Sequence, residues 1–206
     1  MKLIHKSLVG LCILSTLFLG YSASAQKLPK KYRKVQRVLN KSVKNGLSGV
    51  SVYINHPKHG EWQGTSGYAN MEKQEPLLPD HIMSLASVGK TYAATAAVLM
   101  QEEGLLDLDQ LITVYLPKEI TDGIQYADQV TVRQLMNMTT GFYNYSRNPE
   151  LNDLYLSGRL KLDTLSHQKA LERYVFDQKP WAQPGERYNY SSTNYKLLAM
   201  IMDTQL

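Results

Sequence analysis

The sequence has almost no cysteine: of 206 residues, only Cys12 is one. Cys12 lies in an apolar run from Leu8 to Leu19, which follows two lysines and precedes Ala23-Ser24-Ala25, a small-residue pattern of the A-x-A type. These features are typical of a secretory signal peptide. We therefore expect residues 1–25 to be removed by cleavage after Ala25 and the protein to be secreted or periplasmic. The remaining chain would have no cysteine, so the burial of apolar side chains must stabilise its fold without disulfides.

Long apolar runs and a strong net charge are also missing. A membrane-spanning helix needs about 20 apolar residues, and neither the run from Leu8 to Leu19 nor any later segment reaches that length. Retention of this run as an amphipathic anchor is the alternative to cleavage, but we expect no stable membrane anchor. The formal net charge is +5, and Lys2 and Lys6 of the signal peptide contribute two of the positive charges. The excess that remains is too small to predict a nucleic-acid partner.

Motifs for metals and nucleotide cofactors are absent as well. The sequence contains no C-x-x-C, no phosphate-binding P-loop and no G-x-G-x-x-G. His56 and His59 have H-x-x-H form, but Pro57 between them excludes the rigid helix on which such a pair binds a metal. We expect neither a metal nor another cofactor.

Hydrophobic periodicity predicts a helix followed by a hairpin. Basic residues gather between Lys27 and Lys44, where the apolar residues keep helical spacing. We expect an amphipathic helix that ends near Asn45-Gly46, with a solvated charged face and an apolar face that packs on a sheet. Residues 49–54 and 61–69 then predict two antiparallel strands.

The segment with the clearest chemistry is Ser87-Val88-Gly89-Lys90. Helix residues three apart are neighbours on one face, so the Ser87 hydroxyl and the Lys90 amine are predicted to face the same way. A neutral lysine beside a serine can accept its proton and turn it into a nucleophile, which is why S-x-x-K indicates acyl transfer. Ser24-Ala25-Gln26-Lys27 and Ser166-His167-Gln168-Lys169 have the same form. An ordinary helix-capping serine with a surface lysine is therefore the alternative explanation.

The surrounding sequence favours Ser87 over the other two matches. Residues 91–103 predict a helix that stops at Gly104, which places Ser87 in its first turn, where the helix dipole stabilises negative charge. Farther along, Thr131 is predicted to cap a helix over 131–138 that closes near Gly141. The polar, tyrosine-rich residues 142–165 suit either the wall of a cleft or a long surface loop.

Seven segments in a fixed order resemble the serine beta-lactamase and penicillin-binding-protein superfamily, in particular its branch of class C beta-lactamases, DD-peptidases and esterases. They are Gly67-Tyr68-Ala69, Ser87-Val88-Gly89-Lys90, Glu103 to Asp109, Tyr115-Leu116-Pro117, Thr131 to Leu135, Thr139-Thr140-Gly141 and Pro184-Gly185 through Leu198. The resemblance implies an α+β fold of the beta-lactamase/transpeptidase type. In such a fold, residues 26–86 would supply the helix and hairpin of the sheet domain, and residues 87–206 the nucleophile helix and the helical region.

The resemblance also implies the roles of individual residues. Ser87 matches the family nucleophile, Lys90 its partner base, and Tyr190 the tyrosine of the family's Y-x-N element. In such enzymes the hydroxyl attacks a carbonyl, an acyl-enzyme forms, and water releases it, while Lys90 and Tyr190 would share the proton. Ser192 occupies the position of the substrate-binding asparagine.

Two features depart from the family pattern. Because Ser192 replaces the asparagine, Ser192-Thr193-Asn194 and Ser146-Arg147-Asn148, both of S-x-N form, leave a shifted assignment open. In addition, no K-[ST]-G or H-x-G follows Tyr190. The chain is therefore expected to be C-terminally truncated, without the strand that carries the third motif, the remaining sheet strands and the closing helix.

Such a truncation would have two consequences. The missing strand supplies an oxyanion-hole amide in the family, and the loss of one such donor costs roughly 100- to 1,000-fold in rate. The hairpin would also expose an edge and an apolar face that a partner chain could cover.

Two functions therefore remain open. The first is an exported serine hydrolase that acts on a small-molecule or peptide substrate, which could be a beta-lactam, a D-amino-acid peptide or an ester. The second is a non-catalytic remnant that binds cell-wall peptide or a partner protein.

Overall fold

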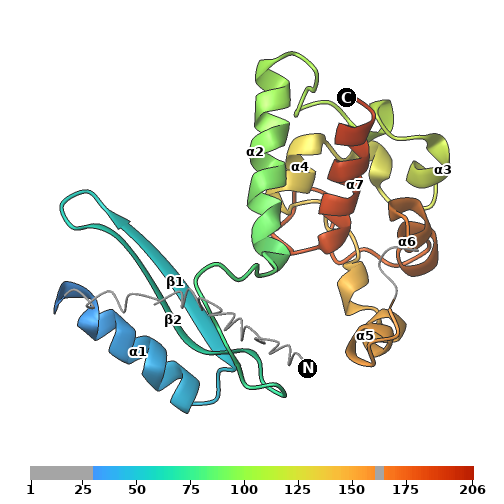
Figure 1. Ribbon diagram of the computed structural model, residues 1–206. Coiled ribbons are helices and arrows are strands. Elements are labelled where there is room, and N and C mark those ends of the chain that lie inside the picture. Colours follow the sequence, from blue (N-terminus) through green and yellow to red (C-terminus); the bar gives the residue numbers. More distant parts are fainter. Residues whose placement is uncertain (1–29, 161–164) are drawn as a thin grey trace, which may run out of the picture. The chain divides into compact units, whose positions relative to one another are not determined.

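The computed structural model describes residues 30–160 and 165–206 (Figure 1). The expected signal peptide lies outside the described residues. The chain divides into two compact units, one that ends at Met83 and one from Ser84 to Leu206, whereas the sequence placed the boundary after residue 86. In the described part of the chain, no helix combines the length and the apolar character that crossing a membrane requires.

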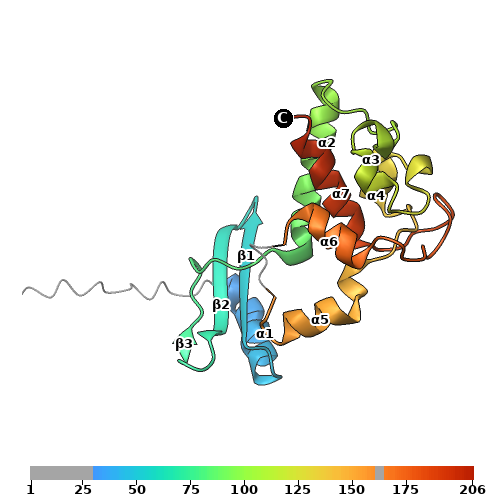
Figure 2. The ribbon, with the colours of Figure 1, turned by 90° about the vertical axis from the view of Figure 1, so that its right-hand side faces the viewer.

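In residues 30–83, the N-terminal unit consists of a helix packed on a small antiparallel sheet (Figures 1 and 2). Its elements are a 3₁₀ turn η1 (Lys30–Tyr32), helix α1 (Arg33–Lys44) and strands β1 (Gly49–His56), β2 (Gly60–Asn70) and β3 (Glu75–Pro76). The strand order is β1-β2-β3. The predicted helix and hairpin are confirmed, and so is the α+β fold class. The two-residue strand β3 was not predicted, because so short a segment has no visible periodicity.

The face of the hairpin that packs on α1 is apolar, and the opposite face is polar. Its core consists of Tyr32, Leu39 and Trp62, against which Val35, Val50, Val52 and Ile54 pack. The rings of Tyr32 and Trp62 are stacked, with centroids 5.0 Å apart. On the opposite face of β1, Ser51, Tyr53 and Asn55 are exposed. Strand residues alternate between faces, so the apolar residues of the hairpin share one face. Helix α1 covers that face, and the expectation of an exposed apolar face on the hairpin was therefore wrong.

Gly67 allows the start of β1 to approach β2 closely. Its φ is +84°, and a Cβ at this position would lie 2.3 Å from the carbonyl oxygen of Ser48. Only glycine tolerates both the left-handed backbone and this approach. The Gly67 carbonyl oxygen also accepts a hydrogen bond from the Leu77 amide, 3.0 Å away, which holds the chain beside β2 just after β3.

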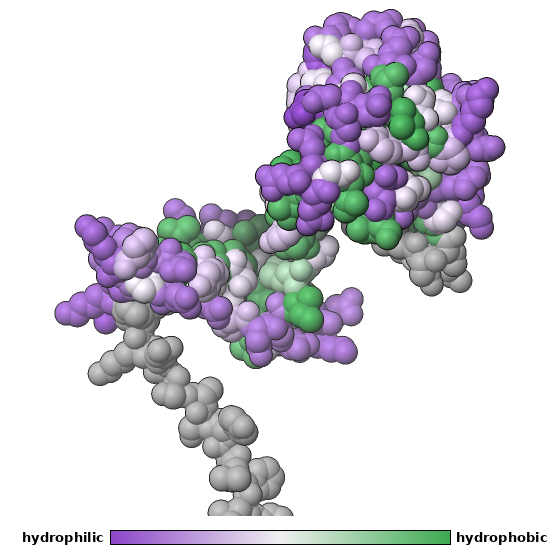
Figure 3. All heavy atoms as spheres, turned by 90° about the horizontal axis from the view of Figure 1, so that it is seen from above, coloured by the Kyte–Doolittle hydropathy of each residue, from purple (hydrophilic) through white to green (hydrophobic). Residues whose placement is uncertain are grey.

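The C-terminal unit is helical and contains the larger core. Its α-helices are α2 (Gly89–Glu102), α3 (Lys118–Thr121), α4 (Val132–Asn137), α5 (Pro149–Leu156), α6 (His167–Tyr174) and α7 (Ser192–Asp203), with 3₁₀ turns η2 (Ala86–Val88), η3 (Ile112–Val114), η4 (Ala127–Gln129) and η5 (Tyr145–Arg147). Helix α7 packs against α2, α4 and α6 and buries Leu197, Leu198 and Ile201 completely. In Figure 3, polar side chains cover much of the visible face of each unit, and exposed apolar side chains are scattered among the polar ones.

Helix α4 begins as predicted and ends early. The Thr131 side chain and Gln134 form a capping box, in which each side chain bonds the backbone amide of the other residue. The helix ends at Asn137 because Met138 takes a left-handed conformation, with φ of +63°. The predicted helix over 131–138 thus extended one residue too far, and its predicted close near Gly141 lies four residues beyond Asn137.

Residues 142–165 contain a helix that the sequence analysis missed. Asn148 caps α5, since its side-chain oxygen accepts hydrogen bonds from the amides of Glu150 and Leu151, and Pro149 occupies the first helical position. This Asn-Pro pair was the available signal. A single long loop over this stretch was the wrong alternative, because Pro149–Leu156 is helical.

Candidate active site

Ser87 lies in a tight turn directly before helix α2. It is the middle residue of η2, and the helix proper begins at Gly89. Ala86 has a φ of +44°, and its amide donates a hydrogen bond to the Ser84 hydroxyl over 3.2 Å. This left-handed residue turns the chain sharply, and the Ser87 side chain is exposed at the N-terminal end of α2.

The structure brings the three predicted catalytic residues together. Lys90 Nζ lies 3.1 Å from Ser87 Oγ, and Tyr190 Oη lies 2.8 Å from the same oxygen. The Lys90 nitrogen is also 5.3 Å from the centre of the Tyr190 ring, within the range of a cation–π contact. Ser87 and Tyr190 are 103 residues apart in the sequence, and all three residues belong to the C-terminal unit.

Another S-x-x-K match shows what a capping serine looks like in this chain. The Ser166 hydroxyl accepts a hydrogen bond from the Lys169 backbone amide over 3.2 Å, and Ser166 is the N-cap of α6. The Ser87 hydroxyl instead accepts hydrogen bonds from Lys90 Nζ and Tyr190 Oη, and the N-cap residues of η2 and α2 are Leu85 and Val88. The ordinary explanation of the motif thus describes Ser166 and not Ser87. The match at Ser24 lies outside the described residues.

The Tyr190 phenol is electrostatically distinct from the two tyrosines near it. Burial raises the pKa of Tyr190, but hydrogen bonding with Lys90, Ser87 and Ser192 outweighs this effect, so the pKa lies below its ordinary value of 10.0. The pKa values of Tyr145 and Tyr195 are both raised, chiefly by burial. A lowered pKa makes the phenolate easier to form, which suits a proton acceptor for a serine hydroxyl.

The end of α4 and the chain after it hold Tyr190 in place. The amide of Asn189 donates to the Met138 carbonyl oxygen over 2.8 Å. The Ser191 hydroxyl donates to the carbonyl oxygen of Tyr143 over 3.1 Å. The Ser192 amide donates to Asn144 Oδ1 over 3.0 Å. These bonds flank Tyr190 on both sides, so its position depends on contacts that sequence analysis did not predict.

The two shifted S-x-N assignments do not fit the geometry. Asn194 is fully buried: its Oδ1 accepts a hydrogen bond from the Thr140 hydroxyl over 2.9 Å, and its Nδ2 donates to the Leu135 carbonyl oxygen over 3.2 Å. Asn148 caps α5. Both asparagines therefore have structural partners, whereas the half-buried Ser192 contributes to the environment of Tyr190.

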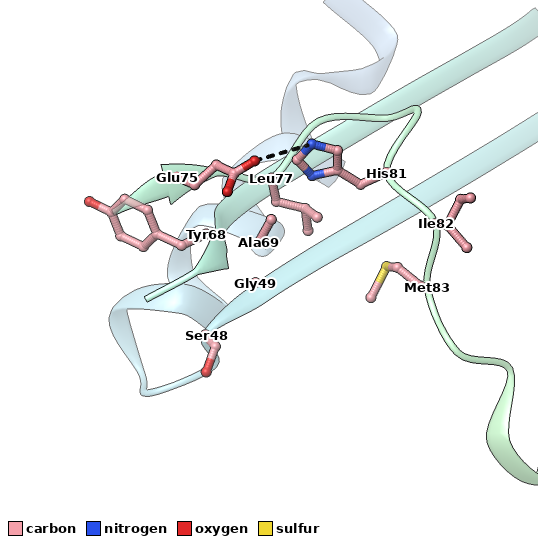
Figure 4. A pocket seen from close by; sticks show the side chains of 9 residues that line it. All are labelled: Ser48, Gly49, Tyr68, Ala69, Glu75, Leu77, His81, Ile82 and Met83. Atoms are coloured by element: carbon pink, nitrogen blue, oxygen red, sulfur yellow. Dashed lines mark ion pairs between the residues drawn. The ribbon is translucent and has the colours of Figure 1, made fainter. Parts of the chain in front are cut away.

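A pocket in the N-terminal unit lacks comparable chemistry. It has a volume of about 410 Å³, and in it His81 Nε2 lies 3.9 Å from Glu75 Oε1 (Figure 4). Ser48 lines the same pocket, and Figure 4 shows it well away from this ion pair. The pocket therefore contains no serine activated by a base.

The two histidines of the H-x-x-H segment lie at the turn between β1 and β2. Their rings stack with centroids 4.4 Å apart, and His56 Nδ1 accepts a hydrogen bond from the Lys58 amide over 3.1 Å. Within residues 30–160 and 165–206, no three His, Cys, Asp or Glu side chains are grouped as metal ligands would be.

Comparison with known proteins links this chain to a family. The family model described as Beta-lactamase matches residues 33–204. Penicillin-binding protein 4* of Bacillus subtilis (strain 168) is 29% identical over 143 residues, which are 66% of this chain and 28% of that protein. A D-stereospecific amidohydrolase from Streptomyces sp. has a TM-score of 0.71 at 27% identity, over 82% of this chain and 48% of that one. The D-amino acid amidase of Ochrobactrum anthropi SV3, crystallised with L-phenylalanine, has a TM-score of 0.66 at 27% identity, over 82% and 43%. The chain thus spans less than half the length of each of these proteins.

Proposed function

Because the chain belongs to the Beta-lactamase family, we propose that it is an exported serine hydrolase in which Ser87 forms an acyl-enzyme. The family match and the likeness in fold confirm the resemblance that the sequence motifs indicated, and the fold is of the beta-lactamase/transpeptidase type. One observation carries the proposal: Lys90 Nζ and Tyr190 Oη both lie within hydrogen-bond distance of Ser87 Oγ. This arrangement is the nucleophile with adjacent base that covalent catalysis requires.

The geometry suggests how the proton moves. Tyr190, as phenolate, accepts the proton of the Ser87 hydroxyl while the serine oxygen attacks the carbonyl carbon of the substrate. The Lys90 ammonium stabilises the negative charge on both oxygens. When the tetrahedral intermediate collapses, the proton passes from Tyr190 to the departing nitrogen or oxygen, and the acyl group stays on Ser87. A water molecule then takes the place of the departed group. Its oxygen attacks the ester while Tyr190 accepts its proton, and that proton returns to the Ser87 oxygen as the acid is released.

The negative charge on the carbonyl oxygen needs a donor of its own. The Ser87 backbone N–H lies at the N-terminal end of α2, where the helix dipole favours an anion. Since Ser87 is exposed, a substrate carbonyl can reach the serine oxygen. The substrate class is an amide, a beta-lactam or an ester; the similar proteins include a D-amino acid amidase and a penicillin-binding protein.

Covalent labelling tests this proposal. The purified protein is incubated with a fluorophosphonate probe and with a fluorescent penicillin, and labelled protein is detected on a gel and by mass spectrometry. We expect label on the wild type and none on Ser87→Ala. Ser166→Ala is the matched control, because it removes the serine of another S-x-x-K segment, and it should be labelled like the wild type. A folded wild type that neither probe labels, or a labelled Ser87→Ala, would contradict the proposal.

Export is tested separately. The chain is expressed with residues 1–25 in a bacterium, and the cell fractions are compared by mass spectrometry. We expect a mature protein that starts at Gln26 in the periplasm or the medium. Uncleaved protein confined to the cytoplasm would contradict export and leave the catalytic proposal unaffected.

A further inference from the structure

A cavity of the C-terminal unit contains polar side chains that the proposed mechanism does not use. It has a volume of about 530 Å³ and is lined by residues of η5, α5, α6 and α7, among them Tyr145, Leu151, Tyr155, His167 and Lys196. This volume lies within the range of small-molecule sites, about 300–1,000 Å³. Leucine and tyrosine side chains make up much of the wall, so the cavity suits the apolar body of a ligand. We call it the Lys196 cavity.

Lys196 is a half-buried cation, and none of the described residues that line this cavity is acidic. Its Nζ lies 5.0 Å from the centre of the Tyr145 ring, and burial lowers its pKa. The two acidic residues of α5, Glu150 and Asp153, each pair with an arginine, and none of the ion pairs among residues 30–160 and 165–206 includes Lys196. A partly desolvated ammonium without a counter-ion is costly, and an anionic ligand would reduce that cost.

His167 gives the cavity a second polar group. It is the first residue of α6. Burial and the charge of Lys196 lower its pKa, and this effect outweighs the opposing influence of Asp203. An imidazole with a lowered pKa is neutral at pH 7 and still carries one N–H donor. The cavity can therefore offer one ammonium and one neutral donor to the same ligand.

The cavity lies close to the candidate active site. Ser192 and Lys196 are four residues apart in α7, so their side chains are neighbours on one face of the helix, with Cβ atoms about 6 Å apart. Tyr145, which lines the cavity, also interacts electrostatically with Tyr190. A group that extends from a substrate at Ser87 along this face of α7 would therefore approach Lys196.

We propose that the Lys196 cavity binds a carboxylate on an apolar small molecule, with the carboxylate paired to the Lys196 ammonium and hydrogen-bonded by His167. If the protein hydrolyses substrates as proposed above, the cavity favours an acyl group that carries such a carboxylate. This second statement rests on the proposed function, whereas the binding itself does not.

Calorimetry tests the binding. The probes are 4-phenylbutyrate and its neutral amide, and the protein is Ser87→Ala, so that the amide cannot be turned over. We expect the acid to bind at least tenfold more tightly than the amide. Adding Lys196→Met should weaken acid binding at least tenfold, and adding Lys196→Arg should preserve it. Lys118→Met, which removes a strongly exposed lysine of α3, is the control and should change nothing.

The results of calorimetry decide the proposal in either direction. Failure of the acid to bind, equal binding of acid and amide, or unchanged acid binding in Lys196→Met would overturn it. Circular dichroism verifies that Lys196→Met is folded, which we expect because methionine replaces a half-buried charge with an apolar side chain of similar length.

A kinetic comparison separates this proposal from the proposed function. The substrates are the mono-p-nitrophenyl ester of glutaric acid and the neutral p-nitrophenyl pentanoate. We expect kcat/KM for the acidic ester, relative to the neutral one, to fall at least tenfold in Lys196→Met. An unchanged ratio would overturn the assignment of the cavity to the acyl group. Absence of hydrolysis of both esters would contradict the proposed function, while calorimetry would still decide the binding.

Discussion

Replacement of Asn194 by alanine should destabilise the C-terminal unit strongly. The side chain is fully buried and joins the start of α7 to two other segments. Its removal leaves the Thr140 hydroxyl without its acceptor and the Leu135 carbonyl without its donor. A buried polar group that loses its partner costs about 1–3 kcal/mol, so the two together predict a loss of about 2–6 kcal/mol in the free energy of unfolding.

Urea denaturation followed by circular dichroism at 222 nm measures this loss. Asn152→Ala is the matched control, because Asn152 is an exposed asparagine of α5, and its effect should stay within about 0.5 kcal/mol. Thr140→Val, which keeps the shape of the side chain, is a second variant in case Asn194→Ala does not fold. It removes the hydroxyl that bonds Asn194 and that also accepts from the Phe142 amide over 3.1 Å.

The double variant Thr140→Val/Asn194→Ala tests whether the two side chains act through each other. It should cost less than the sum of the two single variants by about 0.5–3 kcal/mol, the range for residues that share a hydrogen bond. Two results would refute the reasoning: a loss for Asn194→Ala no larger than that of Asn152→Ala, or strictly additive effects in the double variant.

Three further predictions concern the candidate active site, a surface ion pair and a tight turn. Because the pKa of Tyr190 is lowered, the rate of fluorophosphonate labelling should rise with pH around a midpoint below 10.0. Tyr190→Phe should abolish this pH dependence and slow labelling about 100- to 10,000-fold. A pH dependence that survives in Tyr190→Phe would show that another group is the base. Hydrogen bonding from Arg133 lowers the pKa of Asp109 below 3.8. The stabilisation of wild type relative to Asp109→Asn should therefore be present at pH 7 and fade as the pH falls through that lowered pKa. A difference in urea midpoint between wild type and Asp109→Asn that is the same at pH 7 and pH 2.5 would contradict this. Gly141→Ala should destabilise the protein more than Gly158→Ala. Both glycines have positive φ, so alanine at either position causes backbone strain of about 1 kcal/mol, but of the two only a Cβ at Gly141 would strike a backbone oxygen, 2.1 Å away. Equal losses of melting temperature in the two variants would exclude the steric argument.

Local patterns in the sequence predicted several elements well. The spacing of apolar residues predicted α1 and the β1–β2 hairpin, and Thr131 predicted the start of α4. These features depend on residues that are close in the sequence, so local patterns are enough to predict them. The end of α4 was misplaced because Met138 adopts a left-handed conformation, which is uncommon outside glycine and is imposed by its surroundings.

The candidate active site was predicted in part. The ordered motifs led to Ser87, Lys90 and Tyr190, which lie together. The residues that position them escaped prediction. Asn144, whose side-chain oxygen accepts hydrogen bonds from Ser192 and from nearby backbone and hydroxyl groups, was not singled out. Nothing in its immediate sequence distinguishes it from an ordinary loop asparagine.

What the sequence determined by itself is the local chemistry: a serine and a lysine three residues apart at the start of a helix, a tyrosine far along the chain, and a family pattern that connects them. The sequence favoured Ser87 among its S-x-x-K matches, and only the tertiary structure decided which groups surround each of the two described serines. Ser166 has the same motif as Ser87, and the fold makes one a helix cap and leaves the other exposed beside Lys90 and Tyr190. The physical reason is that the hydrogen bond between Tyr190 and Ser87 joins residues 103 apart in the sequence, and the packing of α7 against α2 and α4 brings them together. The same packing sets the half-buried Lys196 beside a cavity, which no local pattern could indicate.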